Sequence, residues 1–138
     1  MSLEECKAMD RRVIEEMINQ GKYEVAHEIF APEFIYHGPG GQELKGPEGF
    51  IQLISTYRNA FPDLRLKANH MVAEGDSLAV HFSSTGTHTG ELMGLPATGK
   101  KINASGMIFY RVVDGKFIEV WEILEQYTMM QQIEVIPT

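Results

Sequence analysis

Long hydrophobic runs are missing from this sequence, whose unbroken apolar stretches are only a few residues long. A helix that crosses a bilayer needs about 20 consecutive apolar residues. The N-terminus also carries acidic residues where a secretory signal peptide would be basic and then apolar. We therefore expect a cytoplasmic protein without a membrane partner.

Cysteine is nearly absent. Cys6 is the one such residue, so no disulfide can form within the chain. Its helical spacing from Met9 and Val13 is typical of a core thiol rather than a nucleophile.

The five histidines form no HxH, HxxH or HExxH pattern, and the glycines of residues 86–99 precede a predicted strand rather than a helix that could bind phosphate. The sequence therefore predicts neither a metal nor a cofactor.

Positive charge is also scarce, with 12 Lys and Arg against 19 Asp and Glu and a net charge of −7. Such a surface repels the phosphate backbone of nucleic acids, so we expect no nucleic acid partner.

The 138 residues, of which 43% are hydrophobic, suit one domain large enough to enclose a pocket. We place that domain at residues 1–132 and interpret residues 133–138 as a loosely held C-terminal tail.

The first half of the sequence has helical periodicity. Apolar residues that recur every three or four positions predict three helices, at residues 3–19, 23–30 and 47–61. The first helix begins with Ser2 and Glu5, which have the spacing of a capping box. A short β-prone run at residues 34–37 separates the second helix from the third.

From residue 64 onward the period changes to two, which is typical of half-buried strands. It predicts strands at residues 64–72, 78–85, 102–112 and 117–126. The turn sequences Glu74-Gly75-Asp76 and Asp114-Gly115 join neighbouring strands as antiparallel hairpins. Helices followed by antiparallel strands predict an α+β fold, in which a curved antiparallel sheet wraps over the three N-terminal helices and encloses an interior pocket.

Glu122 interrupts an apolar strand face. Three aliphatic residues alternate on that side of the last strand and share its register: Ile118, Val120 and Leu124. Burial among such neighbours raises the pKa of a carboxyl toward neutrality, as general acid or base catalysis requires. In the alternative interpretations, the strand end emerges into water, or Glu122 pairs with Arg58 or Arg65.

Other ionisable residues are weaker candidates. His37 at the end of the first strand and His70 on the apolar face of the second could point into the interior, either as catalytic or ligand-contacting groups or as hydrogen-bonded structural histidines. Glu119 and Glu125 also lie on the last strand or at its end. Charges at such positions commonly serve only to keep a strand solvated.

Several segments together resemble one protein family: Phe61-Pro62-Asp63-Leu64, GTHTGE at residues 86–91, GLPATGK at residues 94–100, and Asp114-Gly115-Lys116 followed by Glu119-Val120-Trp121-Glu122. This combination is similar to the SnoaL-like polyketide cyclases, also called predicted ester cyclases. They belong to the nuclear transport factor two-like superfamily, whose α+β fold is a cone. The similarity extends from the first predicted helix to about Gln132.

The resemblance implies a cofactor-independent enzyme that closes a ring by intramolecular aldol condensation, with a carboxylate as acid and base. It places the family's catalytic carboxylate at Glu122 and a second acid at Glu125, both of which are Asp in the family pattern. The family's common histidine falls on His37. Where cyclases have a His or Asp in the strand before the DGK hairpin, this sequence has Ile108. We therefore expect the pocket to be kept and the cyclase chemistry to be altered or lost.

Two hypotheses follow for the function. The first is a cyclase-, isomerase- or lyase-type enzyme that acts on a small hydrophobic carbonyl compound, with Glu122 as acid and base and with His37 and Glu125 orienting. The second is a non-catalytic module of the same fold that binds a small molecule or dimerises. The residues expected to contact the ligand are Tyr36, Tyr57, His70, Phe82, His88, Met93, Ile108, Tyr110 and Trp121.

The outward face of the predicted sheet is also apolar. It would carry Ala79, His81, Ser83, Met107, Phe109, Phe117 and Trp121. A patch of this kind is larger than a monomer usually exposes, which predicts a homodimer that associates through the sheets.

Overall fold

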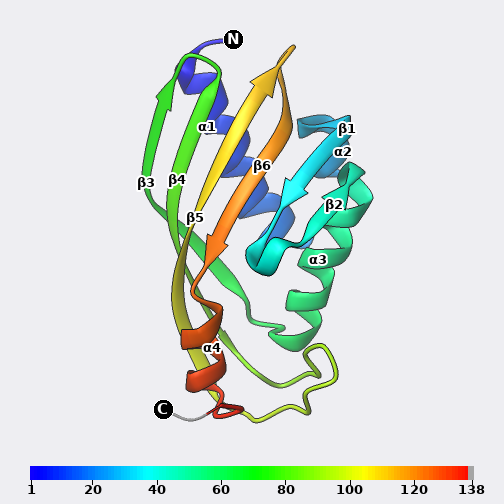
Figure 1. Cartoon of the computed structure of the whole chain (residues 1–138), viewed down its shortest axis with the longest axis vertical. Coiled ribbons are helices and arrows are strands. Elements are labelled where there is room, and N and C mark those ends of the chain that lie inside the picture. The colour runs from blue at the N-terminus through cyan, green and yellow to red at the C-terminus, as the bar shows by residue number, and fades with distance from the viewer. Residues whose placement is uncertain (137–138) are drawn as a thin grey trace.

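A computed structural model describes residues 1–136 of the chain and shows helices packed on one long curved sheet (Figure 1). The helices are α1 (Leu3–Arg12), its continuation as a π-helix (Val13–Ile18), α2 (Val25–Ile29), α3 (Gly46–Ala60) and α4 (Gln126–Gln132), with a short 3-10 turn at Pro39–Gly41. The three N-terminal helices and the α+β fold are confirmed. Helix α4, whose first residue was expected to end the last strand, was not predicted.

The sheet has six strands in the order β2-β1-β6-β5-β4-β3. They are β1 (Phe30–His37), β2 (Glu43–Lys45), β3 (Arg65–Glu74), β4 (Ser77–Thr87), β5 (Lys101–Val113) and β6 (Lys116–Leu124). Strands β3 to β6 are the predicted antiparallel meander. Strand β1 pairs with β6 in parallel, so the expectation of a purely antiparallel sheet is wrong at this one ladder. Strand β2, a three-residue edge strand, was not predicted.

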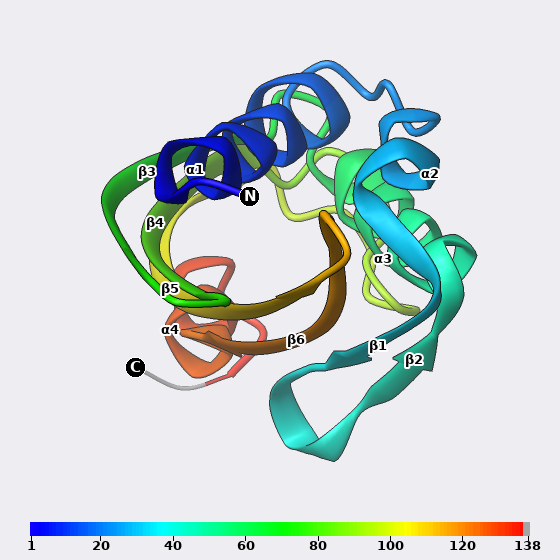
Figure 2. The same cartoon turned by 90° about the horizontal axis from the view of Figure 1, so that it is seen from above.

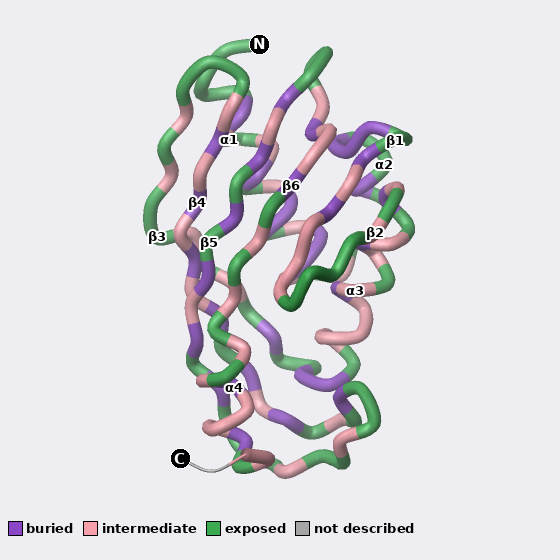
Figure 3. The backbone as a smooth tube through the Cα atoms, in the orientation of Figure 1, coloured by how far each residue is buried: buried purple, intermediate pink, exposed green. Residues whose placement is uncertain are grey.

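The sheet curls around its own concave face, and helices α1 and α3 close the open side (Figure 2). Buried residues recur at every second position along β4 and β5, which places one side of each strand in the core (Figure 3). An alternating strand buries one face and leaves the other to solvent. The core of the protein is therefore the space between the concave face and the helices.

The first helix is fixed at both ends. The Ser2 hydroxyl accepts the Glu5 N–H at 3.1 Å and the Glu5 carboxylate accepts the Ser2 N–H at 3.1 Å, which confirms the capping box. At the other end the helix widens to a π-helix, in which the Asn19 N–H donates to Ile14 O. The Asn19 side chain then exchanges two hydrogen bonds with the backbone of Leu66 on β3. This contact ties the helix to the edge of the sheet.

Two irregularities change which side chains face inward. The register of β3 against β4 shifts between Ala68 and His70, and His70 is consequently exposed rather than on the apolar face. The pairing of β5 and β6 shifts at Arg111 and Val112, and Phe117 is fully buried rather than outward. A bulge adds one residue to one strand, which reverses the faces beyond it. The predicted alternation is therefore wrong beyond each shift.

The C-terminal segment packs against the fold beyond residue 132, where a loosely held tail was expected to begin. Ile133 is 0% exposed and Val135 packs against the core. The domain boundary predicted at residue 132 thus cuts through packed structure, and residues 137–138 of the predicted tail lie outside the described part. No helix within residues 1–136 has the length and apolar character needed to cross a membrane.

The convex face of the sheet exposes large apolar side chains. Met107, Phe109 and Trp121 are exposed there, as the sequence predicted, and Ile123, which was not in the predicted patch, is the most exposed at 76%. A homodimer through this face stays a prediction. Light scattering at micromolar concentration is expected to return about twice the 15.6 kDa of one chain. Ile123→Glu places a charge on this face and should return the monomer, whereas a wild-type mass near that of one chain contradicts the prediction.

Candidate active site

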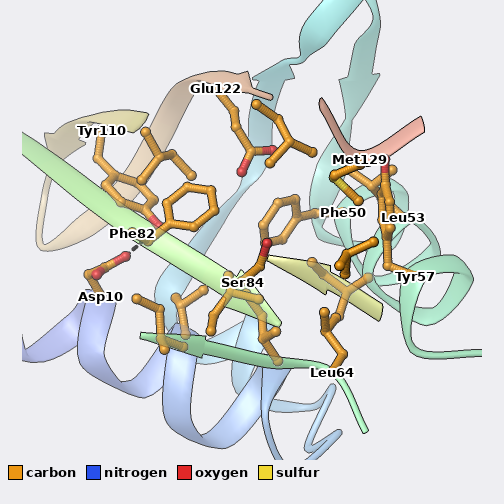
Figure 4. Close-up of a pocket in the computed structure, with 18 residues that line it drawn as sticks. Asp10, Phe50, Leu53, Tyr57, Leu64, Phe82, Ser84, Tyr110, Glu122 and Met129 are labelled. Carbon is orange, nitrogen blue, oxygen red and sulfur yellow. Dashed lines mark hydrogen bonds between the residues drawn. The ribbon is translucent and has the colours of Figure 1, made fainter. Parts of the chain in front are cut away.

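A cavity of about 70 Å³ lies between the concave face of the sheet and the helices. Most of its lining is aliphatic or aromatic and comes from α1 with its π-helical continuation, α3, α4 and strands β3 to β6. Five polar side chains interrupt this lining: Asp10, Tyr57, Ser84, Tyr110 and Glu122. Asp10 and Glu122 lie on different sides of the cavity (Figure 4). The cavity is therefore an apolar enclosure with two carboxyl groups.

Glu122 extends from β6 into this enclosure, opposite Ile108 in the pairing of β5 with β6. Burial raises the pKa of the Glu122 carboxyl, and a hydrogen bond from Tyr36 opposes part of that rise. No described cation pairs with Glu122. The Arg58 guanidinium instead donates to the carbonyl oxygens of Ile18 at 2.6 Å and Asn19 at 3.2 Å, and Arg65 is exposed. The alternative interpretation of a structural ion pair is therefore wrong.

Tyr36 is the partner of this carboxyl. It lies on β1 opposite Val120 of β6, and its hydroxyl donates to Glu122 Oε1. Burial and the nearby Glu122 charge both raise the pKa of the Tyr36 phenol, so the phenol remains protonated as a donor. A Cβ atom at Gly38 would lie 2.5 Å from the Tyr36 ring, closer than side chains approach one another. Glycine at position 38 thus leaves the room that the Tyr36 ring occupies.

Asp10 is a functional candidate that the sequence reasoning missed. It is 0% exposed, and the Tyr110 hydroxyl donates to its Oδ1 atom at 2.6 Å. Its Oδ2 atom has no hydrogen-bond partner among residues 1–136. Burial raises the pKa of Asp10 to about 6, against the opposing effect of the Tyr110 hydrogen bond. A signal was present, because Asp10 lies four residues after Cys6 and three before Val13, on the apolar face of the predicted helix.

Tyr57 of α3 completes the polar lining beside Glu122. Its hydroxyl accepts a long hydrogen bond of 3.5 Å from the Gln126 side chain, which leaves the phenolic proton to donate elsewhere. Burial and the charge of Glu122 raise the pKa of Tyr57, although the Gln126 hydrogen bond opposes the rise. Tyr57 is therefore a protonated donor within the electrostatic reach of Glu122.

The structure does not bring the predicted partners of Glu122 to the cavity. His37 follows Tyr36 on β1 and faces the opposite way, with its Nε2 atom 2.7 Å from Glu119 and its ring stacked on Trp121. Glu125 is exposed, and its carboxylate accepts the Ser105 N–H at 3.1 Å. The expectation that His37 and Glu125 orient the substrate beside Glu122 is therefore wrong.

The predicted contact residues divide into two groups. Four of them line the cavity: Tyr57, Phe82, Ile108 and Tyr110. Tyr36 does not line it but donates a hydrogen bond to Glu122, which does. Four others do not line it: His70, His88, Met93 and Trp121. His70, Met93 and Trp121 are exposed, so these three expectations are wrong.

His88 has a structural role instead. It is 0% exposed and its Nδ1 atom accepts a hydrogen bond from the Thr98 N–H, which ties together the two ends of the connection between β4 and β5.

No cluster of three or more His, Cys, Asp or Glu side chains that could hold a metal ion occurs within residues 1–136.

Comparisons with known proteins agree on one family. Residues 8–133 match the profile of the SnoaL-like polyketide cyclases. The aklanonic acid methyl ester cyclase DauD of Streptomyces sp. (strain C5) is 31% identical over 112 residues, which cover 77% of this chain and 67% of DauD.

Solved structures share the fold over nearly the whole chain. AclR of Streptomyces galilaeus, a proposed hydroxylase, superimposes with a TM-score of 0.87 at 26% identity and covers 99% of this chain and 85% of its own. IdmH of Streptomyces antibioticus, a proposed polyketide cyclase, has a TM-score of 0.82 at 28% identity, with coverage of 93% and 97%. Similar structures thus carry proposals for different reactions, and the side chains of the cavity must decide between them.

Replacing Asp10 by asparagine tests its ionisation. The folded-state pKa of about 6 lies above the ordinary value of 3.8, so the carboxyl destabilises the fold increasingly as the pH rises from 3.8 through 6. The gap corresponds to about 3 kcal/mol. The substitution keeps a carbonyl acceptor for Tyr110, and we therefore expect Asp10→Asn to be more stable by up to about 3 kcal/mol at pH 8, with no gain near pH 4.

Urea denaturation from pH 4 to pH 8 measures this difference. Glu15→Gln, on the same helix but exposed, is the matched control and should show no comparable gain at pH 8. An Asp10→Asn protein that is less stable than wild type at pH 8 would show that a partner stabilises the ionised carboxylate.

Proposed function

The chain belongs to the SnoaL-like polyketide cyclase family, and we propose that it transfers a proton at the carbon next to a carbonyl group of a small hydrophobic compound and so closes a ring. One observation carries the proposal. A carboxyl group with a raised pKa, Glu122, lies in an apolar cavity without a cationic partner among the described residues and with a phenolic donor, Tyr36, on one of its oxygens. Such a carboxyl suits general acid and base catalysis.

The reaction needs no group beyond these side chains. The free carboxylate oxygen of Glu122 takes a proton from the carbon next to the carbonyl, and the electron pair of the broken C–H bond forms an enolate. The enolate carbon attacks a second carbonyl of the same molecule, and a C–C bond forms. The oxygen of that second carbonyl then takes the proton back from the Glu122 carboxylic acid. Proton and charge balance, and Glu122 ends as it began.

Tyr57 is the donor suited to the enolate oxygen. The hydroxyl proton of Tyr36 is directed to Glu122 and that of Tyr110 to Asp10, whereas the Tyr57 hydroxyl acts as an acceptor toward Gln126. A donor aimed at developing negative charge in a dry site stabilises the transition state. We assign this role to Tyr57 because it lines the same cavity as Glu122.

The size of the cavity favours a small substrate. A dry cavity of about 150 Å³ holds benzene, and the cavity here has about 70 Å³. A fused-ring polyketide ester would therefore extend out of the cavity or require its lining to move apart. Small diketones and keto esters require much less movement, and we propose them as the substrate class.

The two departures from the family pattern fit together in this arrangement. Ile108, directly opposite Glu122, removes a polar neighbour and leaves the carboxyl in apolar surroundings. Tyr36 supplies the orienting hydrogen bond from the neighbouring strand instead. The longer Glu side chain is thus held by a phenol, and this supports retained rather than lost proton-transfer chemistry.

A non-catalytic binding module is the second candidate. The apolar Ile108 and the predominantly apolar lining favour it, because such a cavity retains a hydrophobic ligand whether or not a reaction follows. A binding module would be stabilised by its ligand without any turnover or proton exchange.

Proton exchange separates the two candidates. In deuterium oxide the wild type is expected to accelerate loss of the α-proton NMR signals of 2,6-heptanedione, a diketone that can also close a six-membered ring. Glu122→Gln cannot accept the proton and should lose about 10²- to 10⁴-fold of this rate. Glu125→Gln is the matched control and should keep it. Equal rates for wild type and Glu122→Gln, together with ligand-induced thermal stabilisation, favour the binding module.

Tyr36 is expected to set the pH dependence of that exchange. Its hydrogen bond lowers the pKa of Glu122, so Tyr36→Phe raises this pKa further. Because the base must be ionised, the acidic limb of the kcat/KM profile should move to higher pH in Tyr36→Phe. Tyr127→Phe, which changes an exposed phenol, should leave the profile unchanged. A limb that stays in place in Tyr36→Phe would show that Tyr36 does not influence the catalytic ionisation.

A further inference from the structure

The proton transfer assigned to Glu122 leaves the other carboxyl of the cavity without a role. Asp10 lines the same cavity on another side, is 0% exposed and has one oxygen without a hydrogen-bond partner among the described residues. We propose that Asp10 binds a hydroxyl group of the ligand, so that the cavity selects hydroxylated hydrophobic carbonyl compounds. The inference rests on the proposed function only in placing the ligand in this cavity.

The surroundings of Asp10 explain why a partner is needed. Oδ1 accepts the hydroxyl proton of Tyr110, whose ring stacks on Phe117 with 4.0 Å between the ring centroids. Tyr110 is therefore held in place and has no second proton for Oδ2. A buried polar atom without a hydrogen bond is unfavourable, and each such atom in a native protein calls for an explanation. A molecule bound in the cavity that Asp10 lines can supply the missing donor.

The chemistry of the site favours a hydroxyl over other groups. An ionised carboxylate accepts hydrogen bonds and cannot donate them, so a ketone or ether oxygen does not satisfy it. An ammonium group would have to leave water for a lining that is mostly apolar, which is costly for a full charge. A hydroxyl group loses less hydration and supplies one proton, which is what Oδ2 lacks.

The position of Asp10 also gives the ligand a direction. Asp10 projects from α1, and Glu122 projects from β6 on another side of the cavity (Figure 4). A ligand whose hydroxyl meets Asp10 would present its other end to Glu122 and Tyr57. Asp10 is then a specificity-determining residue that touches the substrate away from the reacting carbon.

Phenol and toluene are suitable probes, because they have the same number of heavy atoms and differ in a hydroxyl against a methyl group. Any cost of widening the cavity is similar for both and cancels in the ratio of their dissociation constants. Titration calorimetry at pH 8 gives this ratio for wild type and for Asp10→Asn. The amide introduced by Asp10→Asn would direct its oxygen to Tyr110 and its N–H groups to the cavity, so it no longer offers a carboxylate to the hydroxyl.

We expect the ratio Kd(toluene)/Kd(phenol) to fall about tenfold or more in Asp10→Asn, as loss of a charge-assisted hydrogen bond predicts. Glu15→Gln, with the same charge change on the exposed side of the helix, should keep the wild-type ratio. An unchanged ratio in Asp10→Asn, or a fall in Glu122→Gln alone, overturns the proposal.

The outcome is independent of the proton-transfer proposal. If no variant exchanges α-protons but the ratio still falls in Asp10→Asn, the hydroxyl site stands and the enzymatic function fails. If Glu122→Gln abolishes exchange and the ratio does not change in Asp10→Asn, the enzymatic function stands and Asp10 does not bind the ligand hydroxyl. Far-UV circular dichroism of each variant confirms that a changed ratio does not come from unfolding.

Discussion

Enclosure of the concave sheet face by α1 and α3 is the constraint on which the site depends. A carboxyl group on an open sheet would be hydrated and would titrate near its ordinary pKa, whereas the same group behind two helices loses water. The pKa of each carboxyl group in the cavity is raised in that way, because burial is the largest cause of both shifts. Each also receives one phenolic hydroxyl, from Tyr110 to Asp10 and from Tyr36 to Glu122. The fold thus encloses two acids and gives each a phenolic donor.

Strand β6 shows how strongly the side of the sheet decides the chemistry. Glu119 and Glu122 are three residues apart and therefore face opposite ways. On the convex side, the hydrogen bond from His37 and the nearby Arg111 lower the pKa of Glu119. On the concave side, burial raises the pKa of Glu122. The same alternation on β1 directs Tyr36 inward and His37 outward, which is why a histidine adjacent to the site takes no part in it.

The sequence predicted the helices, the meander and the inward position of Glu122 because these follow from local periodicity. It did not predict the shifts near His70 and Phe117, because a bulge depends on how two strands pair and leaves no mark in either strand alone. The parallel pairing of β1 with β6 joins residues far apart in the chain, so local periodicity could not predict it either. Asp10 was missed for another reason: acidic residues on helices usually face water, and its apolar neighbours were the contrary signal.

Tyr36 connects the turn after β1 to the chemistry of β6. Its phenol reaches Glu122 across the parallel ladder, and its ring packs 5.3 Å from that of Phe50 on α3. Gly38 lies against the Tyr36 ring on another side, so closely that any side chain at position 38 would collide with the ring. A ring confined on these sides loses little further freedom when the carboxyl changes its charge, so the hydrogen bond is preorganised. A glycine outside the cavity thereby contributes to the ionisation of the carboxyl inside it, through the position of one phenol.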